Sequence, residues 1–111
     1  MSVSDARFKT NVSNITDAVS TISQLQGKYF TMIADTTNTQ QMGFIADEVK
    51  LVVPQVVVPS TDENGDELNF LVYCKLTALL VEGIKEQQMT INNNISSITS
   101  LGSRLSVLEN I

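Results

Sequence analysis

The last third of the chain, from Tyr73 to Ile111, carries apolar residues at steps of three and four and holds no proline. That spacing predicts one continuous helix. Its 39 residues would extend about 58 Å at the α-helical rise, which is too long to stay on a small domain. The apolar positions of the second part follow Ile84 and have the spacing of a coiled-coil seam: Ile91, Ile95, Ile98, Leu101, Leu105 and Leu108.

The outer face of this tail consists of Asn, Ser and Thr, which are poor helix formers, so we expect partner strands to hold it. Isoleucine at both seam positions of the first half favours three strands over two. The short step between Ile98 and Leu101 should locally overwind the supercoil. The alternative is a single helix folded back on its own domain.

Two shorter helices are expected before the tail. The first carries Ile15, Ala18, Val19, Ile22 and Leu25 at helical spacing, with Ser13 or Asn14 as its cap and Gly27 at its end. The second carries Ile45, Val49, Val52 and Val53 and stops at Pro54. Residues 28–33 read as a strand, and Gly43 should lie on a strand or at a strand-to-helix bend.

A β-hairpin is expected between the second helix and the tail. Asn64-Gly65 is a strong turn signal between the β-rich runs 56–58 and 68–72. The predicted fold class is therefore α+β: a small globular part with short strands and helices, followed by a long C-terminal helix forming a trimeric coiled coil. The expected division is an N-terminal segment 1–12, a globular part 13–72 and the helix 73–111.

Composition and charge disfavour several classes of function. The net charge of −5 disfavours nucleic acid, no apolar run reaches the length of a membrane span, and the polar first ten residues do not indicate a signal peptide. The absence of histidine removes Ser-His and Cys-His catalysis and the usual zinc and haem ligand sets. We expect no metal and no cofactor, and we expect the single cysteine, Cys74, to be buried.

The segment "SDARFKTN" sets Ser4 and Lys9 five positions apart. A serine nucleophile needs a base, and lysine is the main alternative to histidine. Five residues span about 140° of a helix and opposite faces of a strand. The segment must therefore bend, or Lys9 must serve Ser4 of a neighbouring chain, which we prefer because cleavage would then depend on assembly. Otherwise these residues form an ordinary turn with solvated charges.

Four segments together resemble the C-terminal intramolecular chaperone domain of phage tail spikes and tail fibres, the endosialidase-type chaperone or S74 peptidase family. The opening pattern matches at Ser4, Asp5, Arg7, Phe8, Lys9 and Asn11. The middle pattern matches at Gly43, Ile45, Ala46, Asp47, Glu48 and Val49, and a weaker one at Val53, Pro54, Val56 and Val57. The closing pattern matches at Tyr73, Leu76, Ala78, Leu79, Leu80, Glu82, Gly83, Ile84, Lys85 and Glu86.

The resemblance implies a homotrimer that assists folding of an upstream fibre or spike domain of the same polypeptide and then cuts itself off. Carried over by position, the nucleophile is Ser4, the base is Lys9 and the cleaved bond is Val3-Ser4, so segment 1–12 becomes an autocleavage segment. Arg7 could supply a positive charge that lowers the pKa of Lys9, and Asn11 an oxyanion donor. Asp5 completes the motif.

The same resemblance implies that the precursor forms in the cytoplasm of a bacterial host and that the domain is released after assembly. Gly83 departs from the family's alanine and could allow close packing at a threefold axis. Two other functions stay open: a trimerisation module without cleavage, and a coiled-coil adaptor that binds a partner helix along the stripe from Ile91 to Leu108.

Overall fold

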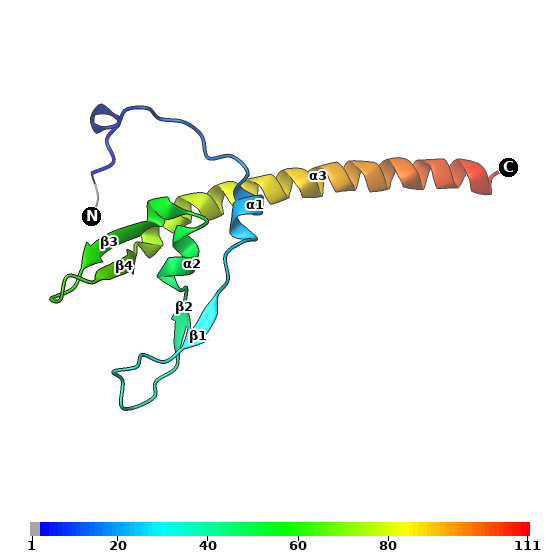
Figure 1. Ribbon diagram of the computed structural model, residues 1–111. Coiled ribbons are helices and arrows are strands. Elements are labelled where there is room, and N and C mark those ends of the chain that lie inside the picture. Colours follow the sequence, from blue (N-terminus) through cyan, green and yellow to red (C-terminus); the bar gives the residue numbers. More distant parts are fainter. Residues whose placement is uncertain (1–2) are drawn as a thin grey trace.

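A small α+β body carries a long projecting helix in the computed structural model, which describes residues 3–111 (Figure 1). The molecule measures 79 × 44 × 24 Å and has a radius of gyration of 21.8 Å. A compact domain of this length would have a radius of about 13 Å. The predicted fold class is confirmed for the single chain, and its trimeric state stays a prediction.

The long helix is α3, which spans Leu76–Glu109 after a 3₁₀ turn at Tyr73–Lys75. Its first turns bury Leu76, Leu79 and Gly83 against the body. Every residue from 87 to 111 is exposed, and this part points away from the body (Figure 1). The continuous helix is therefore confirmed, and the alternative of a helix folded back on its own domain is wrong for this chain.

The first helix, α1, is shorter than predicted and spans Ala18–Ile22. Neither Ser13 nor Asn14 caps it, because the chain stays non-helical up to Asp17, which adopts a left-handed conformation with φ 54°. The side chain of Glu86 on α3 instead accepts hydrogen bonds from the backbone N–H groups of Ala18 and Val19. A tertiary contact thus sets the start of this helix.

The middle of the chain forms a small hairpin and a second short helix. β1 at Lys28–Phe30 pairs antiparallel with β2 at Gln41–Gly43, and α2 at Ala46–Lys50 follows directly. The predicted continuation of α2 to Val53 was wrong, since the chain leaves the α-helix after Lys50. Pro54 then opens a 3₁₀ turn at Pro54–Val56, a position where its missing N–H costs no hydrogen bond.

The predicted second hairpin is confirmed. β3 at Val57–Thr61 pairs antiparallel with β4 at Glu67–Leu71. β4 lies within one residue of the expected run, whereas β3 extends three residues beyond it. Gly65 has a φ of 81°, a conformation that glycine adopts without steric cost. Asp62 Oδ1 accepts the N–H groups of Asn64 and Asp66 and so closes the turn.

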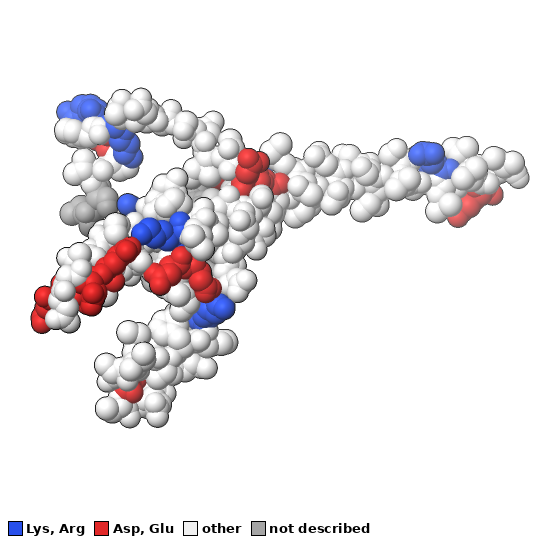
Figure 2. Space-filling view, viewed as in Figure 1, with Lys and Arg blue, Asp and Glu red and all other residues white. Residues whose placement is uncertain are grey.

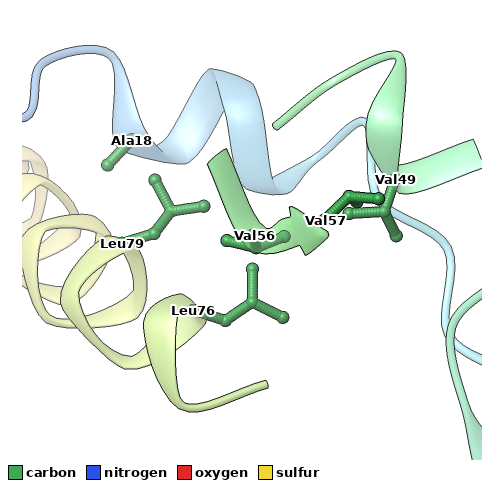
Figure 3. Close-up of a cluster of buried hydrophobic side chains, with 6 residues drawn as sticks. All are labelled: Ala18, Val49, Val56, Val57, Leu76 and Leu79. Atoms are coloured by element: carbon green, nitrogen blue, oxygen red, sulfur yellow. The ribbon is translucent and has the colours of Figure 1, made fainter. Parts of the chain in front are cut away.

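The core is small and aliphatic. Six side chains from five elements meet in it, namely Ala18, Val49, Val56, Val57, Leu76 and Leu79 (Figure 3). Because α3 contributes two of these residues, the body and the base of the helix form one packed unit. So small a core supplies limited stability, which agrees with the expectation that association adds burial.

Two expectations about single residues were wrong. Cys74 is exposed, because it lies in the 3₁₀ turn before α3 and outside the buried face of the helix. Gly83 does not face a threefold axis: it is buried against α1, where an added Cβ would lie 2.5 Å from Ile22 Cδ1. Within the described chain, no helix combines the length and the apolar character that crossing a membrane requires.

Candidate functional site

The opening motif lies on an exposed N-terminal arm, residues 3–17. A 3₁₀ turn at Ala6–Phe8 interrupts this arm. Asp5 caps the turn, since its Oδ1 accepts the backbone N–H of Arg7 at 3.0 Å. The Arg7 guanidinium lies over the Phe8 ring, 5.3 Å from its centroid. The segment thus has a defined local shape without support from the core.

This turn brings Ser4 and Lys9 together. Lys9 Nζ lies 2.7 Å from Ser4 Oγ and donates a hydrogen bond to it. Of the two geometries that the spacing allowed, the single chain has the bend. The distance suits proton transfer in either direction between a hydroxyl and an amine. One chain therefore holds both groups of the predicted dyad in contact, while their catalytic role stays a prediction.

Arg7, the charged residue expected to act on Lys9, is itself paired with a carboxylate. Its Nη2 forms an ion pair with Asp5 Oδ2 at 3.1 Å. The hydrogen bonds that Asp5 accepts from Arg7 lower the pKa of the Asp5 carboxyl below its usual value. The guanidinium thus has a carboxylate partner in its own turn, and the predicted influence of Arg7 on Lys9 stays a prediction.

The bond that the resemblance assigns to cleavage is open to solvent. Val3 is 78% exposed, and Ser4 and Lys9 are exposed as well. A lysine acts as a base only when neutral, and burial or a nearby positive charge favours the neutral form. Asn11, the expected oxyanion donor, is also exposed and turns the backbone with φ 53°. The single chain thus positions the dyad but leaves it uncovered.

The sequence did not predict what fastens the arm to the body. Glu86 is half-buried and binds the first two N–H groups of α1, and Ala18 beside it is fully buried. In the sequence, Glu86 stands out only as a member of the closing pattern, and this position does not predict its contact with α1. The arm therefore starts from a fixed point on α3.

The middle and closing motifs also meet. Tyr73 Oη accepts the backbone N–H of Phe44 at 3.1 Å, just where β2 gives way to α2. A Cβ at Gly43 would lie 2.5 Å from this hydroxyl, so the glycine allows the contact. Gly43 and Tyr73 are thus partners in one packing interaction, and both serve the fold of the body.

The predicted seam forms an uncovered stripe on α3. Its members are 50 to 68% exposed, namely Ile84, Ile91, Ile95, Ile98, Leu101, Leu105 and Leu108. Scattered exposed apolar residues are common on proteins, whereas a stripe of this length is typical of interaction surfaces. In the single chain the stripe lies beyond the reach of the core.

A comparison with protein families finds a match to the peptidase S74 model described as "chaperone of endosialidase", over residues 4–58. This segment contains the opening and middle motifs and ends before the closing pattern at Tyr73. No curated protein matches the chain. The family's description gives a chaperone role and confirms the resemblance seen in the motifs. Over residues 4–58, the chain is therefore similar to the chaperone-of-endosialidase family.

Proposed function

We propose that this chain is a C-terminal intramolecular chaperone that trimerises, assists assembly of an upstream tail fibre or spike domain and releases itself by cutting Val3-Ser4. The match of residues 4–58 to the chaperone family supports the first part. The observation that carries the second part is the 2.7 Å contact between Lys9 Nζ and Ser4 Oγ. The precursor would form in the cytoplasm of the phage's bacterial host.

In the proposed reaction, Ser4 Oγ attacks the carbonyl carbon of Val3 while the neutral amine of Lys9 takes the hydroxyl proton. The amide nitrogen of Ser4 then leaves and takes that proton back from Lys9. An ester between the Val3 carbonyl and Ser4 Oγ results. Water hydrolyses this ester and frees a carboxylate at Val3 and the hydroxyl of Ser4.

Assembly has a defined task in this mechanism. The dyad is complete within one chain but exposed, so we propose that association covers Lys9 and favours its neutral form. The same cover would supply N–H donors to the oxyanion, with Asn11 as one candidate. In this mechanism a neighbouring chain buries the dyad, while Ser4 pairs with Lys9 of its own chain. Cleavage before association would be slow for that reason.

Three copies joined along the α3 stripe would provide this association. Isoleucine at both seam positions of the first half favours three strands. Each buried isoleucine contributes about 1.5–3 kcal/mol, which offsets the poor helix propensity of the surrounding Asn, Ser and Thr. Parallel alignment of three α3 helices would also set three upstream chains in register.

The test is expression of the domain with its natural upstream segment, followed by a denaturing gel. Wild type should give two bands, whereas Ser4→Ala and Lys9→Ala should give one, with a cleavage rate lowered at least about 100-fold. Thr10→Ala removes a neighbouring hydroxyl of the same arm and serves as the matched control. A single band from wild-type trimers would exclude the self-release step.

Mixing the two inactive chains tests the pairing within one chain. Ser4→Ala and Lys9→Ala subunits should stay uncut in mixed trimers, because each chain lacks one of its own groups. Cleavage in such trimers would show that Lys9 serves a neighbour. The formation of mixed trimers is checked by native mass spectrometry with chains of different mass.

A trimerisation module without cleavage is the second candidate, and the exposure of Ser4 and Lys9 favours it. In that case wild type and Ser4→Ala both give one band while light scattering finds trimers. A monomer in light scattering would instead support the third candidate, an adaptor whose stripe binds a partner helix.

A further inference from the structure

The seam of α3 contains one polar position. Ile84 and Ile91 are seven residues apart, and the position between them at the same spacing of four and three is Gln88. The stripe therefore runs Val81, Ile84, Gln88, Ile91, Ile95 and Ile98 in alternating steps of three and four. In a coiled coil built on this stripe, Gln88 would point at the axis between two isoleucine layers.

The rest of the tail contains little that could align the helices. Residues 87–103 carry no charged side chain, and Figure 2 shows colour on the far part of α3 only near its end. Ion pairs beside the seam, which usually set partner and register, are thus missing from this stretch of sequence. Ile84, Ile91 and Ile98 repeat every seven residues, so a slide of about 10.5 Å would superpose isoleucine on isoleucine again.

We infer that Gln88 is the residue that selects the register and the number of chains when copies of this chain associate. The inference deepens the proposed function, since it rests on the trimer. Gln88 Nε2 donates to Asn92 Oδ1 at 2.9 Å on the same helix. This bond orients the amide and leaves its carbonyl oxygen and second N–H free to bond to Gln88 of the other copies.

Arrangements in which the helices slip by a heptad are less stable, because they bury the Gln88 amide without a hydrogen-bond partner in the neighbouring chain. A shift of one heptad would set Gln88 against Val81 or Ile95, where the amide finds no hydrogen-bond partner in the neighbouring chain. An unsatisfied buried amide is costly, whereas a ring of in-register amides is satisfied. The glutamine layer thus lowers the stability of the correct trimer somewhat and disfavours the others much more.

Gln88→Ile tests this inference, with Asn93→Ile on the opposite face of α3 as the matched control. Native mass spectrometry should find only trimers for wild type and control, and a mixture of oligomers for Gln88→Ile. The variant should also melt several degrees higher, because an apolar layer replaces a polar one. Uniform trimers of Gln88→Ile with an unchanged melting temperature would overturn the inference.

The register is measured through Cys74, the single cysteine of the chain and an exposed one. A spin label at this position should give one narrow distance between chains in wild type. Gln88→Ile should broaden it or add longer distances, since chains slide by whole heptads. One narrow distance in both proteins would count against the role of Gln88.

Sorting of chains gives an independent measurement. When tagged wild-type and Gln88→Ile chains are unfolded and refolded together, mixed trimers should fall well below the statistical fraction, because each leaves an amide unpaired. Statistical mixing would contradict the inference while leaving the trimer intact. A wild-type monomer, by contrast, would remove the proposed function itself and this inference with it.

Discussion

The two ends of α3 belong to one helix but depend on different contacts. The first turns bury Leu76, Leu79 and Gly83 against the body of the same chain. The part beyond residue 86 is exposed throughout. An isolated helix with so many Asn, Ser and Thr residues is marginal in water, so we expect the tail to need partners where the base does not. We therefore expect the base to depend on packing within its own chain and the tail to depend on association.

The largest effect is expected from a substitution in the exposed tail of α3, which should weaken association. In a trimer, Ile95→Asp places three carboxylates in one layer of the stripe and removes apolar burial in three chains at once. We expect association to weaken at least about 100-fold, as measured by sedimentation at several concentrations. Met89→Asp, on the other side of α3 and also exposed, should leave trimers intact. Equal loss in both variants would show that the stripe is not the contact.

Leu79→Ala should destabilise the packing of the first turns of α3 on the body. Leu79 is 7% exposed in the core, and truncating such a residue costs about 2–5 kcal/mol of unfolding free energy. Thermal or denaturant unfolding monitored by circular dichroism measures the loss. Leu80→Ala, at a neighbouring half-exposed position, should cost clearly less. Comparable losses would mean that the body does not pack on α3 as described.

Glu86→Ala tests the contact between α3 and α1 at the boundary between the packed base and the exposed tail of α3. The change removes the acceptor of the N–H groups of Ala18 and Val19. By analogy with lost helix caps we expect a loss of about 1 kcal/mol, together with faster hydrogen exchange at the two amides. The control is Glu82→Ala, which removes only an ion pair with Lys85 near the surface. Unchanged exchange at Ala18 would contradict the cap.

The smallest effect concerns the arm. Hydrogen bonds from Arg7 lower the pKa of Asp5 in the folded turn. A lowered folded pKa means that the turn is favoured above the unfolded value, about 3.9, and loses this support as the pH falls through the folded pKa. The chemical shift of the Arg7 amide proton should therefore move only under acidic conditions. Asp5→Ala should abolish this movement, and its persistence would exclude the Asp5 cap.

Periodicity was enough to predict the long helix, the aliphatic stripe and the second hairpin. Steps of three and four residues, the absence of proline and the Asn64-Gly65 pair act locally, so the sequence states them directly. The ends of α1 and α2 were less predictable. The start of α1 depends on Glu86, which lies 68 residues away in the sequence. Rules for helix caps consider only residues close in sequence, so they cannot predict such a contact.

The candidate site was predictable as a pair of residues but not as a geometry. The spacing of Ser4 and Lys9 allowed either a bend within one chain or pairing between chains. The 3₁₀ turn capped by Asp5 decides for the bend, because a short turn shortens the path between the two side chains. The same turn gives Arg7 a carboxylate partner that its place in the motif did not predict.

The sequence alone determined that this chain has a small aliphatic body, a long helix with an apolar stripe and the residues of the S74 opening motif, since pattern and residue type carry that information. Only the tertiary structure decided that Lys9 reaches Ser4 in its own chain, that Gly83 faces α1 and that Glu86 fastens the arm. These facts depend on distances between segments that are remote or bent, and no linear spacing encodes them.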